Sequence, residues 1–260
     1  MTLIFVMLAA VGKTSAQNQA PPETPLETEA IALYNQGTTL YKTGKYQEAI
    51  NAFKRSIRLQ PDFAWAYNNL GVAYSDSGSY SEAVAVLNEA LRLRSGFAEA
   101  RRNLGAAYYH LGRVSEAVLE FDQAIRLKPD YEAAYTDLAA ALSKLNRHSE
   151  AIIAQEKAIR LNPQSAPTFN DLGCAYSRAG QNEKAIKAFK KSLALNSVYD
   201  EAHFNLAAVY LAENNRNSSL EQYARLKSLN VELAEKLYKA LFTIRYTKAR
   251  SQSRAEDLAR

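Results

Sequence analysis

Asparagine or aspartate recurs at six positions of this sequence, at a constant spacing of 34 along the chain. An amide side chain offers both a hydrogen-bond donor and an acceptor, and a carboxylate offers acceptors. A regular series of such groups suits the main chain of an extended peptide, whose own polar groups also recur regularly. The six residues, called the polar series below, are Asn35, Asn69, Asn103, Asp137, Asp171 and Asn205.

Four further residues lie close in sequence to the polar series. Tryptophan and arginine are enriched among residues that dominate binding energies, and the chain offers Trp65, its only tryptophan, and Arg102. Asn68 and Asn170 each directly precede a member of the series. We predict that these residues line one binding groove, with Trp65 and Arg102 as anchors. Two alternatives stay open: the polar side chains bond between neighbouring helices, or Trp65 packs against the first repeat.

Residues that usually carry catalysis or bind metals are few. The three histidines, His110, His148 and His203, lack the HExxH spacing of a zinc-binding helix. The single cysteine, Cys174, excludes an intrachain disulfide and a multi-cysteine metal site. The chain also lacks the Gly-x-Ser-x-Gly turn of serine hydrolases. We therefore predict no enzymatic activity, no cofactor and no metal site.

The number and spacing of the glycines indicate which structural elements position these residues. The chain has only 10 glycines and 7 prolines, which argues against a turn-rich β fold. One set of glycines recurs at the period of the polar series or a multiple of it, and a second set follows seven positions later. The two sets are Gly37, Gly71, Gly105 and Gly173, and Gly44, Gly78, Gly112 and Gly180.

With Ala30 as position 1, the period divides the chain into six repeats. Their ranges are 30–63, 64–97, 98–131, 132–165, 166–199 and 200–233. The repeats share leucine at position 7, glycine at 8, tyrosine at 11, alanine at 20, phenylalanine at 24 and proline at 32, with departures in individual repeats. This pattern resembles the tetratricopeptide repeat family.

The resemblance implies an all-α fold, a right-handed α-solenoid of helix-turn-helix repeats whose first helices line a concave face. It also implies a protein- or peptide-binding function. The polar series, at position 6, is similar to the asparagine ladder in the repeat domain of O-linked N-acetylglucosamine transferase, where the ladder holds a peptide main chain. The catalytic domain of that enzyme has no counterpart in this sequence.

The recurring residue types within each repeat have physical explanations. Small residues at positions 8 and 20 allow two helices to cross closely, because a larger side chain would overpack the crossing. Glycine at position 15, replaced by Asn146 and Asn214 in two repeats, suits a left-handed residue that ends the first helix. Proline at position 32 is expected to begin the next helix.

The ends of the chain differ from the repeats. Residues 2–11 are almost entirely apolar, too few to span a bilayer, and residues 1–16 are predicted to be a signal peptide. Residues 17–29 are rich in proline and are predicted to be an extended spacer. Residues 234–250 are predicted to form a basic helix that caps the last repeat, followed by a tail at 251–260.

Charge is concentrated at the C-terminal end. Positions 236–260 contain seven basic and two acidic side chains, so they account for the whole net charge of +5, and the charges at positions 1–235 sum to zero. A neutral body makes nucleic acid an unfavoured partner.

We therefore predict a non-enzymatic protein- or peptide-binding scaffold. It is expected to be exported to the periplasm or the exterior, or cytoplasmic if the N-terminal apolar run is not a signal. Two alternatives remain: a helical-repeat RNA-binding protein, and an envelope assembly factor that contacts anionic membrane through its basic C-terminal end. The oligomeric state is left open.

Overall fold

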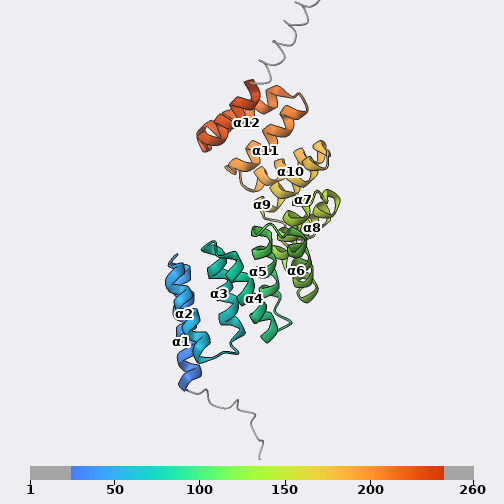
Figure 1. The fold of residues 1–260 in the computed structure, drawn as a ribbon. Coiled ribbons are helices and arrows are strands. Elements are labelled where there is room, and N and C mark those ends of the chain that lie inside the picture. Colours follow the sequence, from blue (N-terminus) through green and yellow to red (C-terminus); the bar gives the residue numbers. More distant parts are fainter. Residues whose placement is uncertain (1–24, 243–260) are drawn as a thin grey trace, which may run out of the picture.

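The computed structural model describes residues 25–242, which form a curved stack of helical hairpins (Figure 1). The predicted signal peptide, residues 17–24 of the spacer and the tail lie outside the described residues. Each hairpin pairs a first with a second helix. The first helices are α1 (Pro25–Lys42), α3 (Ala64–Asp76), α5 (Ala98–His110), α7 (Glu132–Lys144), α9 (Ala166–Arg178) and α11 (Asp200–Ala212). The second helices are α2 (Tyr46–Leu59), α4 (Tyr80–Leu93), α6 (Val114–Leu127), α8 (His148–Leu161), α10 (Asn182–Leu195) and α12 (Arg216–Leu229).

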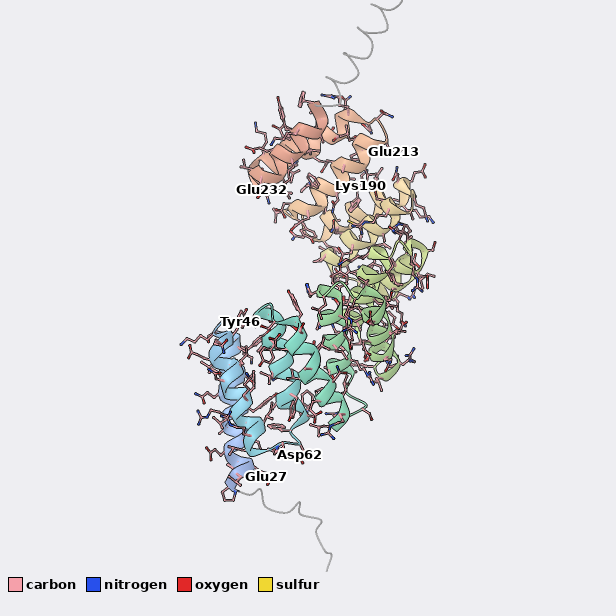
Figure 2. The ribbon with its side chains drawn as sticks, viewed as in Figure 1. Glu27, Tyr46, Asp62, Lys190, Glu213 and Glu232 are labelled. Carbon is pink, nitrogen blue, oxygen red and sulfur yellow. The ribbon has the colours of Figure 1, made fainter. Side chains whose placement is uncertain are left out.

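The helices keep the period of the sequence. From α3 onward, the first helices begin at the same position of each successive repeat, and all six second helices do so too. Figure 2 shows the antiparallel course of the first hairpin: Glu27 and Asp62 lie at one end and Tyr46 at the other. The described part of the chain is thus an all-α solenoid, as the sequence predicted.

Two boundaries differ from the prediction. Helix α1 begins at Pro25, so residues 25–29 of the predicted spacer are helical; proline is tolerated in the first turn of a helix. The position-32 prolines do not begin helices. Pro61 and Pro129 each follow the first residue of a turn closed by a backbone hydrogen bond, from Phe63 N–H to the Gln60 carbonyl and from Tyr131 N–H to the Lys128 carbonyl. Proline is favoured there because its φ suits that position of a turn.

The predicted role of glycine at position 8 is confirmed. A Cβ built on Gly105 would lie 2.7 Å from Cε1 of Phe121, the buried position-24 side chain of the same hairpin. The fourth repeat carries Ala139 here and Gln155 opposite it. Gln155 is 1% exposed, and its Nε2 donates to the Thr168 carbonyl at 3.1 Å. In the fourth repeat, the larger residue at position 8 thus occurs with an unbranched side chain at position 24.

The predicted left-handed residues are also confirmed. Position 15 has positive φ in all six repeats, between 58° for Asn214 and 82° for Gly78. Glycine and asparagine adopt this conformation with little strain.

The last described helix, residues 231–242, covers the end of the stack. Ala234, Leu237 and Leu241 are buried against Ala207 and Leu226 of the sixth repeat. The rest of the predicted capping helix lies outside the described residues. Among residues 25–242, no helix combines the length and the apolar content that crossing a membrane requires.

Candidate functional site: the inner face of the first helices

First helices of neighbouring repeats pack against each other at four of the five junctions. These are α1 with α3, α3 with α5, α5 with α7, and α9 with α11. Within residues 25–242, no comparable contact joins α7 and α9, and the second helices of neighbouring repeats do not pack in this way. The first helices therefore line the inner side of the curved stack, and the polar series, which lies on them, belongs to this inner face.

The polar series forms a chain of bonds between repeats. At four junctions, a member of the series bonds to the position-5 side chain of the preceding repeat. The four bonds are Asn69 Nδ2 to Tyr34 Oη at 3.0 Å, Asn103 Nδ2 to Asn68 Oδ1 at 2.9 Å, Arg102 Nε to Asp137 Oδ2 at 2.6 Å, and Asn205 Nδ2 to Asn170 Oδ1 at 3.0 Å. In each bond the two residues are 35 apart in the sequence.

A second row of pairs lies further along the same helices and has the same separation. Tyr41 donates its hydroxyl to the Asp76 carboxylate, and burial together with this contact raises the pKa of Tyr41 to about 12. The Lys144 ammonium lies 4.4 Å from the centre of the Tyr109 ring. Much of the polar material of the inner face thus holds the repeats to one another, as one of the two alternatives proposed.

Arg102 and Asp137 form an ion pair and are not free anchors. Each side chain is about one-third exposed, and the guanidinium also lies over the Tyr131 ring at 5.9 Å. Burial raises the pKa of Asp137, although Arg102 opposes that shift. Removal of either partner would leave a half-buried charge unpaired.

The junction between the fourth and fifth repeats lacks both kinds of pair. By the pairing rule of the four other junctions, Thr136 should bond to Asp171. The second row, which is recorded at two junctions, would pair Ser143 with Arg178 here. Within residues 25–242, neither pair is joined by a hydrogen bond. Thr136 bonds to Glu132 in its own helix, and the Asp171 carboxylate accepts only a long 3.5 Å bond from Asn170.

A cavity opens at this junction. Its volume is about 160 Å³, and Thr136, Ser143, Asp171 and Arg178 are among its lining residues. Asp171 is an exposed residue, but desolvation at the cavity raises the pKa of its carboxyl group, because the long bond from Asn170 and the more distant charge of Arg178 do not offset the loss of water. The inner face therefore offers one carboxylate that the described part of the chain does not pair, at a place where the first helices leave room.

The two remaining predicted residues, Asn35 and Trp65, lie on first helices in different settings. Asn35 is exposed, and it belongs to the first repeat that the structure describes. Trp65 is 42% exposed; its ring meets Phe97 edge-on at 4.4 Å and lies 5.3 Å from the Arg94 guanidinium. Trp65 thus packs toward the end of its own repeat, not against the first repeat, and part of its ring stays open to solvent.

Two of the histidines and the cysteine have defined surroundings within residues 25–242. His203 is buried, with its two ring nitrogens near Gln222 Oε1 at 2.7 Å and the Ser197 carbonyl at 3.1 Å, and His110 stacks on Tyr80. Burial raises the pKa of the Cys174 thiol to about 11. Over the described range, no group of three or more His, Cys, Asp or Glu residues could hold a metal ion.

Sequence reasoning missed the pairing of positions 5 and 6 across repeats. One signal was available: Arg102 and Asp137, at the position-5 to position-6 separation, carry opposite charges. The open junction had a signal too, since Thr136 is too short to replace the tyrosine, asparagine or arginine found at position 5 elsewhere.

Comparisons with known proteins agree with this architecture. A family model described as the C-terminal domain of cilia and flagella-associated protein 70 matches residues 6–240. A search of curated proteins gave no match. Similar solved structures include MamA from Desulfovibrio magneticus RS-1, which is 26% identical with a TM-score of 0.61 and matches 65% of this chain and 96% of MamA.

Two more distant structures share the fold. PilF of Pseudomonas aeruginosa is 17% identical with a TM-score of 0.71, and the match covers 84% of this chain and 99% of PilF. YrrB, described as a tetratricopeptide repeat protein with an unusual peptide-binding site, is 23% identical with a TM-score of 0.59; the match covers 72% of this chain and 98% of YrrB.

Proposed function

This chain belongs to the tetratricopeptide repeat family, in the group represented by the C-terminal domain of cilia and flagella-associated protein 70, and we propose from that premise that it is a non-enzymatic scaffold. In this proposal, the inner face binds an extended segment of another protein. The observation that carries the proposal is the unpaired Asp171 carboxylate in the cavity between α7 and α9.

The structure changes which residues are expected to contact the segment. The amides of Asn69, Asn103 and Asn205 are partly used between repeats, so each keeps only its remaining polar capacity for a partner. Asp171 keeps most of its capacity. A carboxylate in a partly desolvated place gains most from a charged donor, so the segment is expected to place a lysine or arginine there.

Trp65 supplies a second contact nearer the N-terminal end of the inner face. Its exposed ring surface, backed by Phe97 and Arg94, is held in place and can cover an apolar side chain of the segment. Asn35, which belongs to the first repeat, extends the same polar series toward the end of the stack.

The test is affinity capture from the native compartment, followed by measurement of the captured partner's affinity. Asp171→Arg reverses the charge in the cavity and is expected to weaken binding at least about tenfold. Asp62→Arg makes the same change in an exposed turn and serves as the matched control. If the partner binds Asp171→Arg and the control equally well, the inner-face site is wrong.

The same measurement separates the two other candidate functions. Binding of RNA would fall steeply with added salt, because each phosphate contact releases counterions. Binding to anionic vesicles would depend on the basic residues after position 235. A captured protein whose affinity depends on Asp171 and changes little with salt argues against both.

We also propose that the chain is exported, because of the apolar run at residues 2–11 and the small residues Thr14, Ser15 and Ala16 that follow it. Mass spectrometry of the protein from its native source tests this. A mature N-terminus at Gln17 supports cleavage, and an intact Met1 contradicts it.

A further inference from the structure

Tyrosines at position 11 of the repeats share a packing role between successive hairpins. All four of these tyrosines lie on first helices, and three of them, Tyr74, Tyr176 and Tyr210, contact the position-25 residue on the second helix of the preceding repeat. Lys54 lies 5.3 Å from the Tyr74 ring, Lys190 lies 6.0 Å from the Tyr210 ring, and the Tyr176 hydroxyl donates to Glu156 Oε1 at 2.8 Å. All three pairs join the same two repeat positions, so the contact is a repeating feature of the junctions.

The junction between the third and fourth repeats breaks this rule. Position 11 of the fourth repeat is Leu142, and the position-25 residue before it is Asp122. Leucine is shorter than tyrosine and has no hydroxyl group. Among the described residues, the Asp122 carboxylate therefore makes no hydrogen bond or ion pair, whereas Glu156 at the next junction has both a ring and a hydroxyl donor beside it.

An apolar cavity occupies the place of the missing ring. It lies between the second helices α6 and α8, over α7, and its volume is about 350 Å³. Buried Val118, Leu138 and Leu142 form part of its lining, with Tyr135, and Ile153 lies at its edge with 64% of its surface exposed. A cavity of about 150 Å³ is enough to hold benzene, so a single aromatic ring fits this space.

The charges around the cavity narrow the chemistry of its occupant. Arg147, at the edge, is paired with Glu150 at 2.6 Å, and Arg126 and Arg147 act on Asp122 through their charge without a hydrogen bond. Lys157 and Arg160 also belong to the lining, so an incoming cation would meet like charges there. Burial raises the pKa of Asp122, so the carboxylate would gain from a neutral hydrogen-bond donor as well as from a cation. A phenol supplies a ring for the apolar lining and a hydroxyl for the carboxylate.

We propose that this cavity is an anchor site for a tyrosine side chain of a partner protein. The incoming ring takes the place that position-11 tyrosines occupy at neighbouring junctions, and its hydroxyl donates to Asp122 as the Tyr176 hydroxyl donates to Glu156. Tyrosine is common among the residues that anchor protein interfaces. Because the cavity lies between second helices, this site is independent of the inner-face site proposed above.

The probe is p-cresol, which is the tyrosine side chain as a free molecule, and toluene is the same ring without the hydroxyl. Titration of the ¹⁵N-labelled protein is expected to shift backbone amide signals around residues 118–122, 138–142 and 153–154. Because of the hydroxyl bond to Asp122, p-cresol is expected to bind about tenfold more tightly than toluene. Asp122→Ala should bring p-cresol down to the affinity of toluene.

The decisive variant is Leu142→Tyr, which restores the ring found at position 11 of four other repeats. It is expected to abolish p-cresol binding while the melting temperature stays the same or rises. Leu40→Tyr makes the same change in the first repeat, before which the described residues contain no second helix, and this variant should bind p-cresol as the wild type does. The proposal is overturned if Leu142→Tyr still binds p-cresol, if toluene binds as tightly as p-cresol, or if the wild type binds neither.

A last measurement addresses the source of the tyrosine. Sedimentation of the wild-type chain is expected to give a monomer whose mass Leu142→Tyr does not alter. A dimer that Leu142→Tyr dissociates would assign the cavity to a second copy of this chain and would overturn the assignment to a different protein.

Discussion

The contact between positions 8 and 24 can be tested with Gly105→Ala. This substitution should lower the stability of the protein when Phe121 is present, but not when Phe121 is replaced by glutamine. Gly105→Ala places a Cβ 2.7 and 2.8 Å from two carbons of the Phe121 ring, which is buried and cannot move without disturbing its neighbours. Overpacking of this kind costs about 1–3 kcal/mol, and the helix propensity of alanine over glycine returns up to about 1 kcal/mol. With the full propensity gain, these two contributions leave a net loss of up to about 2 kcal/mol.

For a protein of this size, a loss of about 2 kcal/mol corresponds to a fall in melting temperature of about 4–8 °C. The fourth repeat supplies the comparison, because it already has alanine at position 8 and glutamine at position 24. Ala139→Gly should also destabilise, by about 1–2 kcal/mol, because the helix loses the propensity of alanine and the core loses a buried methyl group. In the background Phe121→Gln, Gly105→Ala should become neutral or stabilising.

Thermal unfolding followed by circular dichroism measures all four variants. Hydrogen exchange of the α5 and α6 amides reports the local effect, since long repeat arrays do not always unfold as one unit. If Gly105→Ala stabilises the protein in the presence of Phe121, the close helix crossing does not explain the glycine period.

Four further outcomes are expected. Burial raises the pKa of Asp171, so the folded state binds the carboxyl proton more strongly than the unfolded state does and loses stability as pH rises. Asp171→Asn should therefore raise the melting temperature at pH 7, and this gain should disappear below about pH 4. A gain in melting temperature that is independent of pH would contradict the account. Arg102→Met should cost about 1–2 kcal/mol in urea unfolding by leaving Asp137 unpaired, and Arg102→Met with Asp137→Asn should recover most of the loss; no recovery would show that the ion pair is not the cause. With its pKa raised to about 11, Cys174 should react with iodoacetamide at pH 8 about 100-fold more slowly than free cysteine, and a comparable rate would contradict its burial. Asn146 has a φ of 60°, so Asn146→Gly should stabilise the protein by up to about 1 kcal/mol, whereas Gly112→Ala should destabilise it by about 1–2 kcal/mol. Equal effects of the two substitutions on stability would refute the need for left-handed residues at position 15.

The period of the glycines was sufficient to predict the hairpins and the places where they turn. The roles of Gly112 and Asn146 depend on local backbone conformation, and the role of Gly105 depends on the size of the space beside it. Each role can therefore be recognised within one repeat. The same is true of the buried alanines at position 20, such as Ala117.

Features that depend on neighbouring repeats were harder to predict. Whether Asn103 faces a ligand or Asn68 depends on the rotation between repeats, which the sequence of one repeat does not contain. The two cavities arise from side chains that are too short, Thr136 and Leu142, and a missing contact is recognised only after the regular contact is known. The binding groove predicted from residue types is therefore in large part a set of contacts between repeats, with Asp171 as the exception.

The unequal junctions also have a mechanical consequence. A solenoid bends by small rotations between successive hairpins, and cross-repeat bonds on its inner side resist those that open the curve. Four junctions carry such a bond, and the one between α7 and α9 carries none among the described residues. We expect the stiffness of the stack to be lowest at that point, so that the first four repeats and the last two swing as two arms about the Asp171 cavity when the protein is pulled or compressed.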